Sequence, residues 1–166
     1  VEIIRRLLRH SSLKRLNGTI LAVPVVNVFG FIHKTRYLPD RRDLNRSFPG
    51  SETGSLGGRM AWQFKTQVLD RATHAVDLHT GAIHRANLPQ IRADLSNDDT
   101  AAMAAAFGVP VVINSVLGEG TLREVAEAQG IPVITYEAGE ALRFDESCIR
   151  AGVKGVLNVM HHLNMT

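Results

Sequence analysis

Cysteine is almost absent from this chain of 166 residues, and Cys148 is the only one. A single thiol excludes an internal disulfide and a metal site built from several thiolates. Any metal site must therefore use histidine and carboxylate side chains. A chain with one cysteine also suits a reducing compartment, and we expect a cytoplasmic protein.

Long apolar runs are also missing. No segment approaches the roughly 20 consecutive apolar residues that a membrane-spanning helix needs. The first residues show no apolar segment followed by a small-residue cleavage site, which would mark a secretion signal. We therefore expect no membrane partner.

Neither sign of charge is in large excess, because the formal net charge is only +3. Four cations fall within residues 34–42, but no aromatic residues alternate with basic ones as they do in many nucleic-acid-binding surfaces. We expect no nucleic-acid partner, and instead a small anionic substrate, since guanidinium groups match carboxylates. No glycine-rich phosphate loop follows the first expected strand, which argues against a nucleotide-binding module.

The pattern of apolar residues predicts alternating helices and strands. We expect one α/β domain over residues 1–166, with a mainly parallel, mixed sheet and helices on both faces. The expected helices cover residues 1–8, 58–71, 98–107, 121–130 and 145–163. The expected strands cover residues 19–28, 75–81, 109–113 and 131–136. Residues 27–58 have no periodic pattern, and a long irregular segment in a compact domain favours a functional loop.

Local signals support several of these boundaries. Asn97 or Asp98 is placed to cap one helix, and Thr121 with Glu124 three residues later forms a capping box for the next. Each of these two helices is followed by a glycine and then by an apolar strand. Pro24 weakens the first expected strand, because proline cannot donate to a strand ladder.

The strand around Asp77 and His79 carries the first chemically suggestive pair. Side chains two residues apart in a strand leave on the same face, so the carboxylate and the imidazole are expected side by side. Open α/β sheets bind ligands at the carboxyl ends of their strands. The pair fits either a metal-ligand or acid/base histidine steered by a carboxylate, or a half-buried histidine satisfied by its neighbour.

Two further clusters accompany this pair. Asn45 and Arg46 lie in a loop flanked by prolines, where an amide and a guanidinium can hold a carboxylate. A solvated charged loop would explain the same charges. Glu137 ends an apolar strand just before a glycine, where it is expected near His79 and suited to act as a general base. An exposed glutamate at a strand end is the alternative.

Taken together, the three clusters resemble the succinylglutamate desuccinylase and aspartoacylase family, which is of the zinc carboxypeptidase type. The resemblance covers nearly the whole chain and rests on motifs in the family's order. These are Asp43-Leu44-Asn45-Arg46-Ser47-Phe48-Pro49-Gly50, Asp77-Leu78-His79-Thr80-Gly81 and Tyr136-Glu137-Ala138-Gly139. The first motif is quite specific, whereas the other two are short.

The resemblance implies a zinc-dependent hydrolase of the amide bond of a small N-acyl amino acid or related compound. It implies that His79 is a Zn²⁺ ligand and that Glu137 is the general base. Asn45 and Arg46 would hold the substrate's carboxylate. An arginine near the scissile carbonyl is also implied, and both Arg36 and Arg42 are candidates because the loop spacing varies.

The chain departs from the family in one respect. A His-x-x-Glu segment, which supplies two zinc ligands in the family, does not occur in these 166 residues. We expect the remaining ligands upstream of Val1 and a β domain beyond Thr166, so that the piece alone is inactive. A non-catalytic, carboxylate-binding α/β domain without a complete metal site is the alternative. The acyl group, the amino acid and the oligomeric state are left open.

Overall fold

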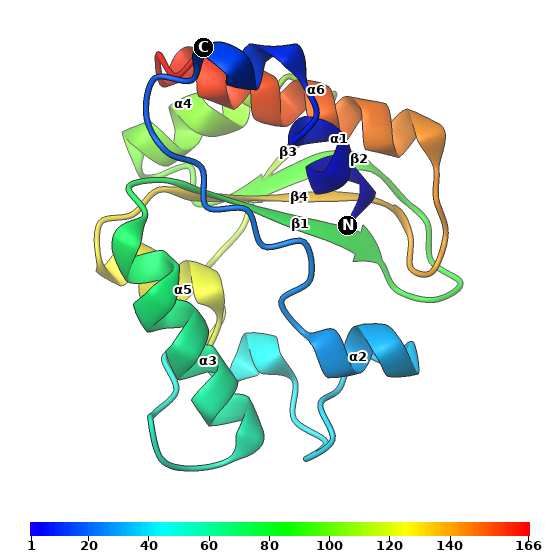
Figure 1. The fold of residues 1–166 in the computed structure, drawn as a ribbon, viewed down its shortest axis with the longest axis vertical. Coiled ribbons are helices and arrows are strands. Elements are labelled where there is room, and N and C mark those ends of the chain that lie inside the picture. The colour runs from blue at the N-terminus through cyan, green and yellow to red at the C-terminus, as the bar shows by residue number, and fades with distance from the viewer. The chain divides into compact units, whose positions relative to one another are not determined.

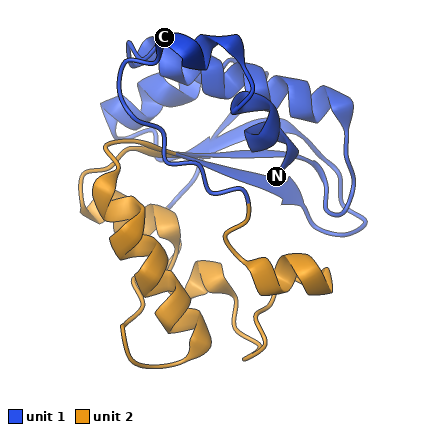
Figure 2. Ribbon diagram, viewed as in Figure 1, with its two compact units in different colours: residues 1–24, 76–116, 134–166 blue, residues 25–75, 117–133 orange.

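The computed structural model describes residues 1–166 and divides them into two compact units, each built from separate chain segments (Figure 2). Unit 1 comprises Val1–Pro24, Val76–Val116 and Ile134–Thr166, and unit 2 comprises Val25–Ala75 and Leu117–Val133. The expectation of one domain over residues 1–166 stays a prediction. No helix is both long enough and apolar enough to cross a membrane.

Unit 1 contains nearly all of a four-stranded sheet with the strand order β1-β4-β2-β3 (Figure 1). Its helices lie on one face of this sheet. The strands are β1 (Ala75–Gly81), β2 (Asn87–Ala93), β3 (Val111–Asn114) and β4 (Val133–Glu140). The helices are α1 (Glu2–Leu7), the short 3-10 helix η1 (Ser11–Arg15), α4 (Asp98–Phe107) and α6 (Glu146–His162).

The sheet is mixed, as expected. β2 pairs with β3 in parallel and with β4 in antiparallel register. At one end of β1 the Ala75 N–H donates to the Pro132 carbonyl, and at the other end the Ala141 N–H donates to the Gly81 carbonyl. β1 and β4 therefore run in the same direction, and their carboxyl ends share one edge of the sheet.

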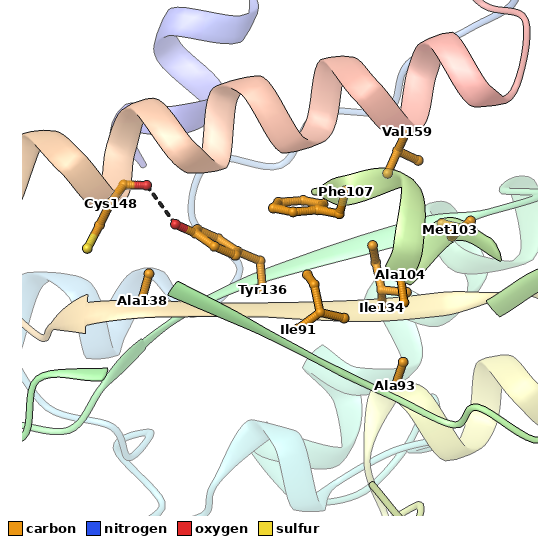
Figure 3. Packing of buried hydrophobic residues seen from close by; sticks show 10 residues of the cluster. All are labelled: Ile91, Ala93, Met103, Ala104, Phe107, Ile134, Tyr136, Ala138, Cys148 and Val159. Atoms are coloured by element: carbon orange, nitrogen blue, oxygen red, sulfur yellow. Dashed lines mark hydrogen bonds between the residues drawn. The ribbon is translucent and has the colours of Figure 1, made fainter. Parts of the chain in front are cut away.

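The core of unit 1 lies between the sheet and its helices (Figure 3). The rings of Phe107 and Tyr136 stack with their centroids 5.0 Å apart. Tyr136 also donates a hydrogen bond of 2.8 Å to the Cys148 carbonyl of α6. Val76 and Leu78 pack against this cluster from β1. The helix-facing side of the sheet is thus apolar, and the intervening residues of each strand face the other side.

Unit 2 is mainly helical. It contains α2 (Val28–His33), η2 (Leu44–Arg46), α3 (Leu56–Gln67), η3 (Leu69–Arg71) and α5 (Leu122–Ala128). One of its clusters is built on Leu38, Leu44, Phe48 and Ala61. The Phe48 and Phe64 rings meet edge to face with centroids 6.1 Å apart, so the motif loop is anchored on α3.

The capping signals are confirmed. The Asn97 side chain accepts from the Thr100 N–H, and the Thr121 hydroxyl accepts from the Glu124 N–H. The Glu124 carboxylate reaches back to the Gly120 N–H at 2.7 Å. The helix-to-strand joints each contain a glycine with positive φ, 79° at Gly108 and 70° at Gly130. These short-range bonds explain why the boundaries of α4 and α5 were predictable.

The structure differs from the sequence expectations in three places. Residues 19–28 form no strand: residues 19–27 carry neither helix nor strand, and Val28 begins α2. Pro24 lacks an N–H, and a β-branched run becomes a strand only where a partner strand exists. No strand was expected over residues 87–93, where the structure has β2 with Pro89 in its middle. Finally, the segment 27–58 is less irregular than expected, because it contains α2.

Candidate active site

β1 places the predicted histidine and carboxylate on the polar face of the sheet. Val76 and Leu78 face the core of unit 1, so Asp77 and His79 leave on the opposite side. His79 Nε2 and Asp77 Oδ2 are 2.8 Å apart, and their side chains retain 31% and 21% of their exposure. The predicted pairing is therefore confirmed, in a half-buried setting that suits a functional side chain as well as a structural one.

β4 places Glu137 on the same face. Tyr136 and Ala138 belong to the core cluster, which turns the side chain between them to the polar side. The two backbone hydrogen bonds that join the ends of β1 and β4 enclose His79 on one strand and Glu137 on the other. These two residues therefore occupy neighbouring stretches of adjacent parallel strands, near their carboxyl ends.

Polar residues of β2 surround Glu137, and the sequence reasoning missed them. Asn87 Nδ2 and Gln90 Nε2 each donate to Glu137 Oε2 at 3.2 Å. Arg92 Nη1 lies 3.8 Å from the same oxygen. Ile91 and Ala93 are fully buried, and their alternation with Gln90 and Arg92 was the available signal for a strand. Pro89 obscured that signal.

The carboxyl end of β4 carries a second acid, Glu140, which accepts a hydrogen bond from the turn after β1. The His84 N–H donates to Glu140 Oε1 at 2.9 Å, and Arg143 Nε approaches Oε2 at 3.1 Å. The hydrogen bond from the His84 backbone, followed by the nearby Arg143 charge, lowers the pKa of Glu140 below its ordinary value. Glu140 is therefore an ionised anchor for the loop at this edge of the sheet.

The Asp-Leu-Asn-Arg loop lies in unit 2 and is held by its own polar side chains. Asp43 Oδ1 accepts from the Asn45 N–H at 3.0 Å. The Asn45 side-chain oxygen accepts from the Leu122 N–H at 2.9 Å, in the first turn of α5. Asn45 therefore links this loop to a helix end through its side-chain oxygen.

Arg46 is exposed and lines an open hollow of unit 2. The hollow is lined by Arg46, Phe48, Pro49, Glu119, Gly120 and Glu124. Arg46 Nη1 donates to the Asn45 carbonyl at 2.6 Å, which holds one terminal nitrogen of the guanidinium on its own loop. A cation held in this way can present its remaining N–H groups to an anion.

The two other candidate arginines differ in their surroundings. Arg36 Nε donates to Asp43 Oδ2 at 2.8 Å, and Nη2 of the same guanidinium lies 2.8 Å from that oxygen. Arg42 Nε lies 3.8 Å from Asp40 Oδ2, and its side chain is 63% exposed. The hydrogen bond from the Gly57 N–H, with smaller help from Arg42, lowers the pKa of Asp40. Arg36 is thus held by an acid, whereas Arg42 is loosely held.

The predicted site residues fall into two groups. Unit 1 brings together Asp77 and His79 and places Glu137 on the same face. Unit 2 holds Asn45 and Arg46, together with Arg36 and Arg42. Each group is internally ordered by hydrogen bonds that the motif residues themselves make.

The described residues do not by themselves provide a metal centre. No group of three or more His, Cys, Asp or Glu side chains is arranged to hold a metal ion. A catalytic zinc site uses three protein ligands, and this chain offers the His79 imidazole with its carboxylate neighbour. The donor set of these 166 residues is therefore short of what zinc requires, although a carboxylate-bound imidazole is a typical single zinc ligand.

The α/β fold and the motif positions define a carboxypeptidase-like domain, and comparison with known proteins identifies its family. Residues 1–163 match the succinylglutamate desuccinylase/aspartoacylase catalytic domain. The chain belongs to this family, and the resemblance seen in its motifs is confirmed. It adopts the α/β fold of the family's solved structures.

Two solved structures are close in fold. The product-bound ectoine utilization protein EutE (DoeB) from Ruegeria pomeroyi has a TM-score of 0.88 and 27% identity, covering 99% of this chain and 52% of that one. A succinylglutamate desuccinylase/aspartoacylase from Rhodobacter sphaeroides has a TM-score of 0.86 and 30% identity, covering 98% and 50%.

A curated relative is also similar over the whole chain. The N-alpha-acetyl-L-2,4-diaminobutyric acid deacetylase of Halomonas elongata is 22% identical over 173 residues, covering 99% of this chain and 51% of the relative. The chain thus spans about half the length of the proteins it matches.

Proposed function

We propose that the protein hydrolyses the amide bond of a small N-acylated amino acid or a related compound, as a zinc-dependent deacylase. The observation that carries the proposal is the placement of His79 and Glu137 on one polar face, near the carboxyl ends of adjacent strands. Membership of the family supports it, as does the similarity to a deacetylase of an N-acetylated diamino acid.

Each residue has a proposed role. Glu137 accepts a proton from the attacking water and returns it to the leaving nitrogen. Oxygen adds to the acyl carbon and the carbon–nitrogen bond breaks, so the products are a carboxylate and an amine. Asn45 and Arg46 bind the carboxylate of the amino-acid part through an amide and a guanidinium.

His79 is proposed as one zinc ligand, and the others are proposed to come from residues outside these 166. When bound, zinc supplies a Lewis acid that lowers the pKa of water to about 7. The Asp77 carboxylate orients the imidazole of His79. A piece limited to these residues is proposed to be inactive, because its donor set is incomplete.

Arg36 and Arg42 are the two candidates for one cation near the scissile carbonyl, where a positive charge opposes the developing oxyanion. Alanine variants at the two positions can be compared directly by their kcat. Replacing the arginine that faces the carbonyl by alanine is expected to lower kcat by 10²-fold or more, as for the loss of an oxyanion donor. Replacing the other is expected to leave kcat within about twofold of the parent, as remote surface substitutions usually do.

The test uses the full-length protein, with zinc measured by elemental analysis and hydrolysis by a panel of N-acyl amino acids. We expect about one zinc per chain, lost in His79→Ala and retained in the control His162→Ala, whose side chain is exposed on α6. Release of free amino acid by the parent and by His162→Ala, but not by His79→Ala, completes the support. Absence of zinc from the parent and both variants would contradict the ligand role, and would favour a carboxylate-binding domain without catalysis.

A further inference from the structure

β2 contains an irregularity directly opposite Glu137. Asn87 pairs with Gly139 and Gln90 pairs with Glu137, so three steps along β2 match two steps along β4. One extra residue is therefore inserted in β2 between these pairs, which is a β-bulge. Pro89 lies in the inserted stretch, and bulges are among the few places in a sheet where proline is found.

The bulge changes which way the β2 side chains face. In a regular strand, residues three apart point to opposite faces of the sheet. The extra residue turns Asn87 and Gln90 to the same face of the sheet. Their amides both reach Glu137 Oε2 at 3.2 Å. Without the bulge, one of the two amides would face the apolar core. Bulges are frequent beside active sites because they redirect side chains in this way.

Both amides bind the same oxygen of the carboxylate. Glu137 Oε2 accepts from Asn87 and Gln90, and the Arg92 guanidinium stays 3.8 Å from it. Oε1 is the oxygen that neither amide holds. Amides are uncharged, so they fix the orientation of the carboxylate without forming the close ion pair that a contacting arginine would form.

We propose that Asn87 and Gln90 are positioning residues that hold Glu137 by Oε2 and present Oε1 for proton transfer. This inference rests on the proposed function, because it assigns a purpose to the proposed general base. A glutamate side chain has three rotatable bonds, and a base that is displaced by about 1 Å can lose 10²-fold in rate. Two amides on one oxygen restrict that freedom before substrate arrives.

A merely structural role for the two amides predicts a different result. If they only satisfied a half-buried carboxylate, their loss would lower the free energy of unfolding by about 1 kcal/mol each and leave catalysis by the folded protein unchanged. If they position Glu137, their loss lowers kcat while KM stays the same, since the base acts in the chemical step.

The first test compares Gln90→Met and Asn87→Leu in the full-length protein. Both substitutions keep similar side-chain volume and remove the N–H donors. We expect kcat to fall between about tenfold and 10²-fold, with KM within about twofold. Gln129→Met is the matched control, because Gln129 Nε2 makes the same kind of bond to Asp70 Oδ1, at 3.0 Å in unit 2. A kcat for Gln90→Met and Asn87→Leu equal to that of the control overturns the proposal.

A double-mutant cycle makes the test specific to Glu137. Glu137→Asp keeps a carboxylate but shortens it, which takes its oxygens away from the two amides. In that background we expect Gln90→Met to lower kcat by less than about twofold, because the two substitutions act through one interaction. A full, additive loss in the double variant would show that Gln90 acts elsewhere, and would overturn the proposal.

Crystal structures separate this inference from the proposed function. In the double variant with Asn87→Leu and Gln90→Met, we expect the Glu137 carboxylate to leave the orientation that it has in the parent. An unchanged orientation overturns the positioning role, whether or not the protein is active. If an activity screen finds no hydrolysis of N-acyl amino acids by the parent, that result contradicts the proposed function instead. The comparison of the two crystal structures stays valid.

Discussion

The imidazole of His79 and the carboxylate of Asp77 are joined by a hydrogen bond of 2.8 Å between Nε2 and Oδ2, although both leave the same strand. An ionised carboxylate is only an acceptor, so in the neutral imidazole this bond places the proton on Nε2 and the lone pair on Nδ1. Asp77 therefore selects the tautomer and the ring orientation of His79. In a zinc site, that selection determines which nitrogen can bind the metal.

The first prediction concerns this pair. In the full-length protein, Asp77→Asn is expected to weaken zinc binding by about 10- to 100-fold, because the amide no longer fixes the tautomer. Competition with a metallochromic chelator measures the affinity. Asp99→Asn, at an exposed acid in the first turn of α4, is the control and is expected to bind zinc like the parent. Equal affinities in all three proteins would show that Asp77 has no part in the site.

The second prediction distinguishes the role of the Asn45 side-chain oxygen from that of its NH₂ group. Its oxygen accepts the Leu122 N–H, and its NH₂ group is the proposed substrate donor. Asn45→Asp keeps an acceptor at the start of α5, where a negative charge is favourable, so stability is expected to be preserved. The donor is lost, and a carboxylate opposes the anionic substrate, so KM is expected to rise at least tenfold.

Asn45→Ala is the companion to this variant. It removes both the acceptor and the donor, so we expect the free energy of unfolding to fall by about 1 kcal/mol, the usual cost of losing a side chain that caps a helix. Urea unfolding measures this loss. A fall of the same size in Asn45→Asp would mean that the acceptor does not anchor the loop.

The third prediction concerns Gly155 in α6. Helix propensity alone favours replacing Gly155 by alanine, by about 1 kcal/mol. A Cβ at this position would lie 2.0 Å from Phe107 Cε1, so the ring of α4 occupies the space that a side chain needs. We expect Gly155→Ala to destabilise the protein by about 1–3 kcal/mol in urea unfolding, the usual cost of overpacking. Lys154→Ala, one residue away and exposed, is the control and is expected to change stability by less than about 0.5 kcal/mol.

The fourth prediction concerns alkaline pH. Burial, followed by the nearby Cys148 and Asp145, raises the pKa of Tyr136 above its ordinary value. An unfolded tyrosine ionises near pH 10, whereas the folded one keeps its proton. The resulting contribution to stability is complete below about pH 10 and is lost as the pH rises above that value.

Tyr136→Phe tests this dependence. At pH 8 the variant is expected to be less stable by about 1 kcal/mol, because it lacks the hydrogen bond to the Cys148 carbonyl. Between pH 8 and pH 11, urea unfolding should show a smaller loss of stability in the variant than in the parent. Parallel losses in the two proteins would mean that Tyr136 is not the group responsible.

Much of the site is encoded in local sequence. The alternation of Val76 and Leu78 with Asp77 and His79 was sufficient to place both polar side chains on one face of β1. Capping bonds span three or four residues, so Thr121 and Glu124 marked the start of α5 without any knowledge of the fold. The order of the three motifs was sufficient to suggest the family.

Other features depend on partners that are distant along the chain, and only the tertiary structure decided them. Residues 19–28 have the composition of a strand but pair with no strand of the sheet, so they form none. β2 has an unfavourable composition, with Pro89 inside it, yet it is held between β3 and β4. The bulge that turns Asn87 and Gln90 toward Glu137 exists only as a mismatch between two strands, and no single strand's sequence contains it. Strand pairing is a non-local interaction, which is why the helix caps were predictable and the surroundings of Glu137 were not.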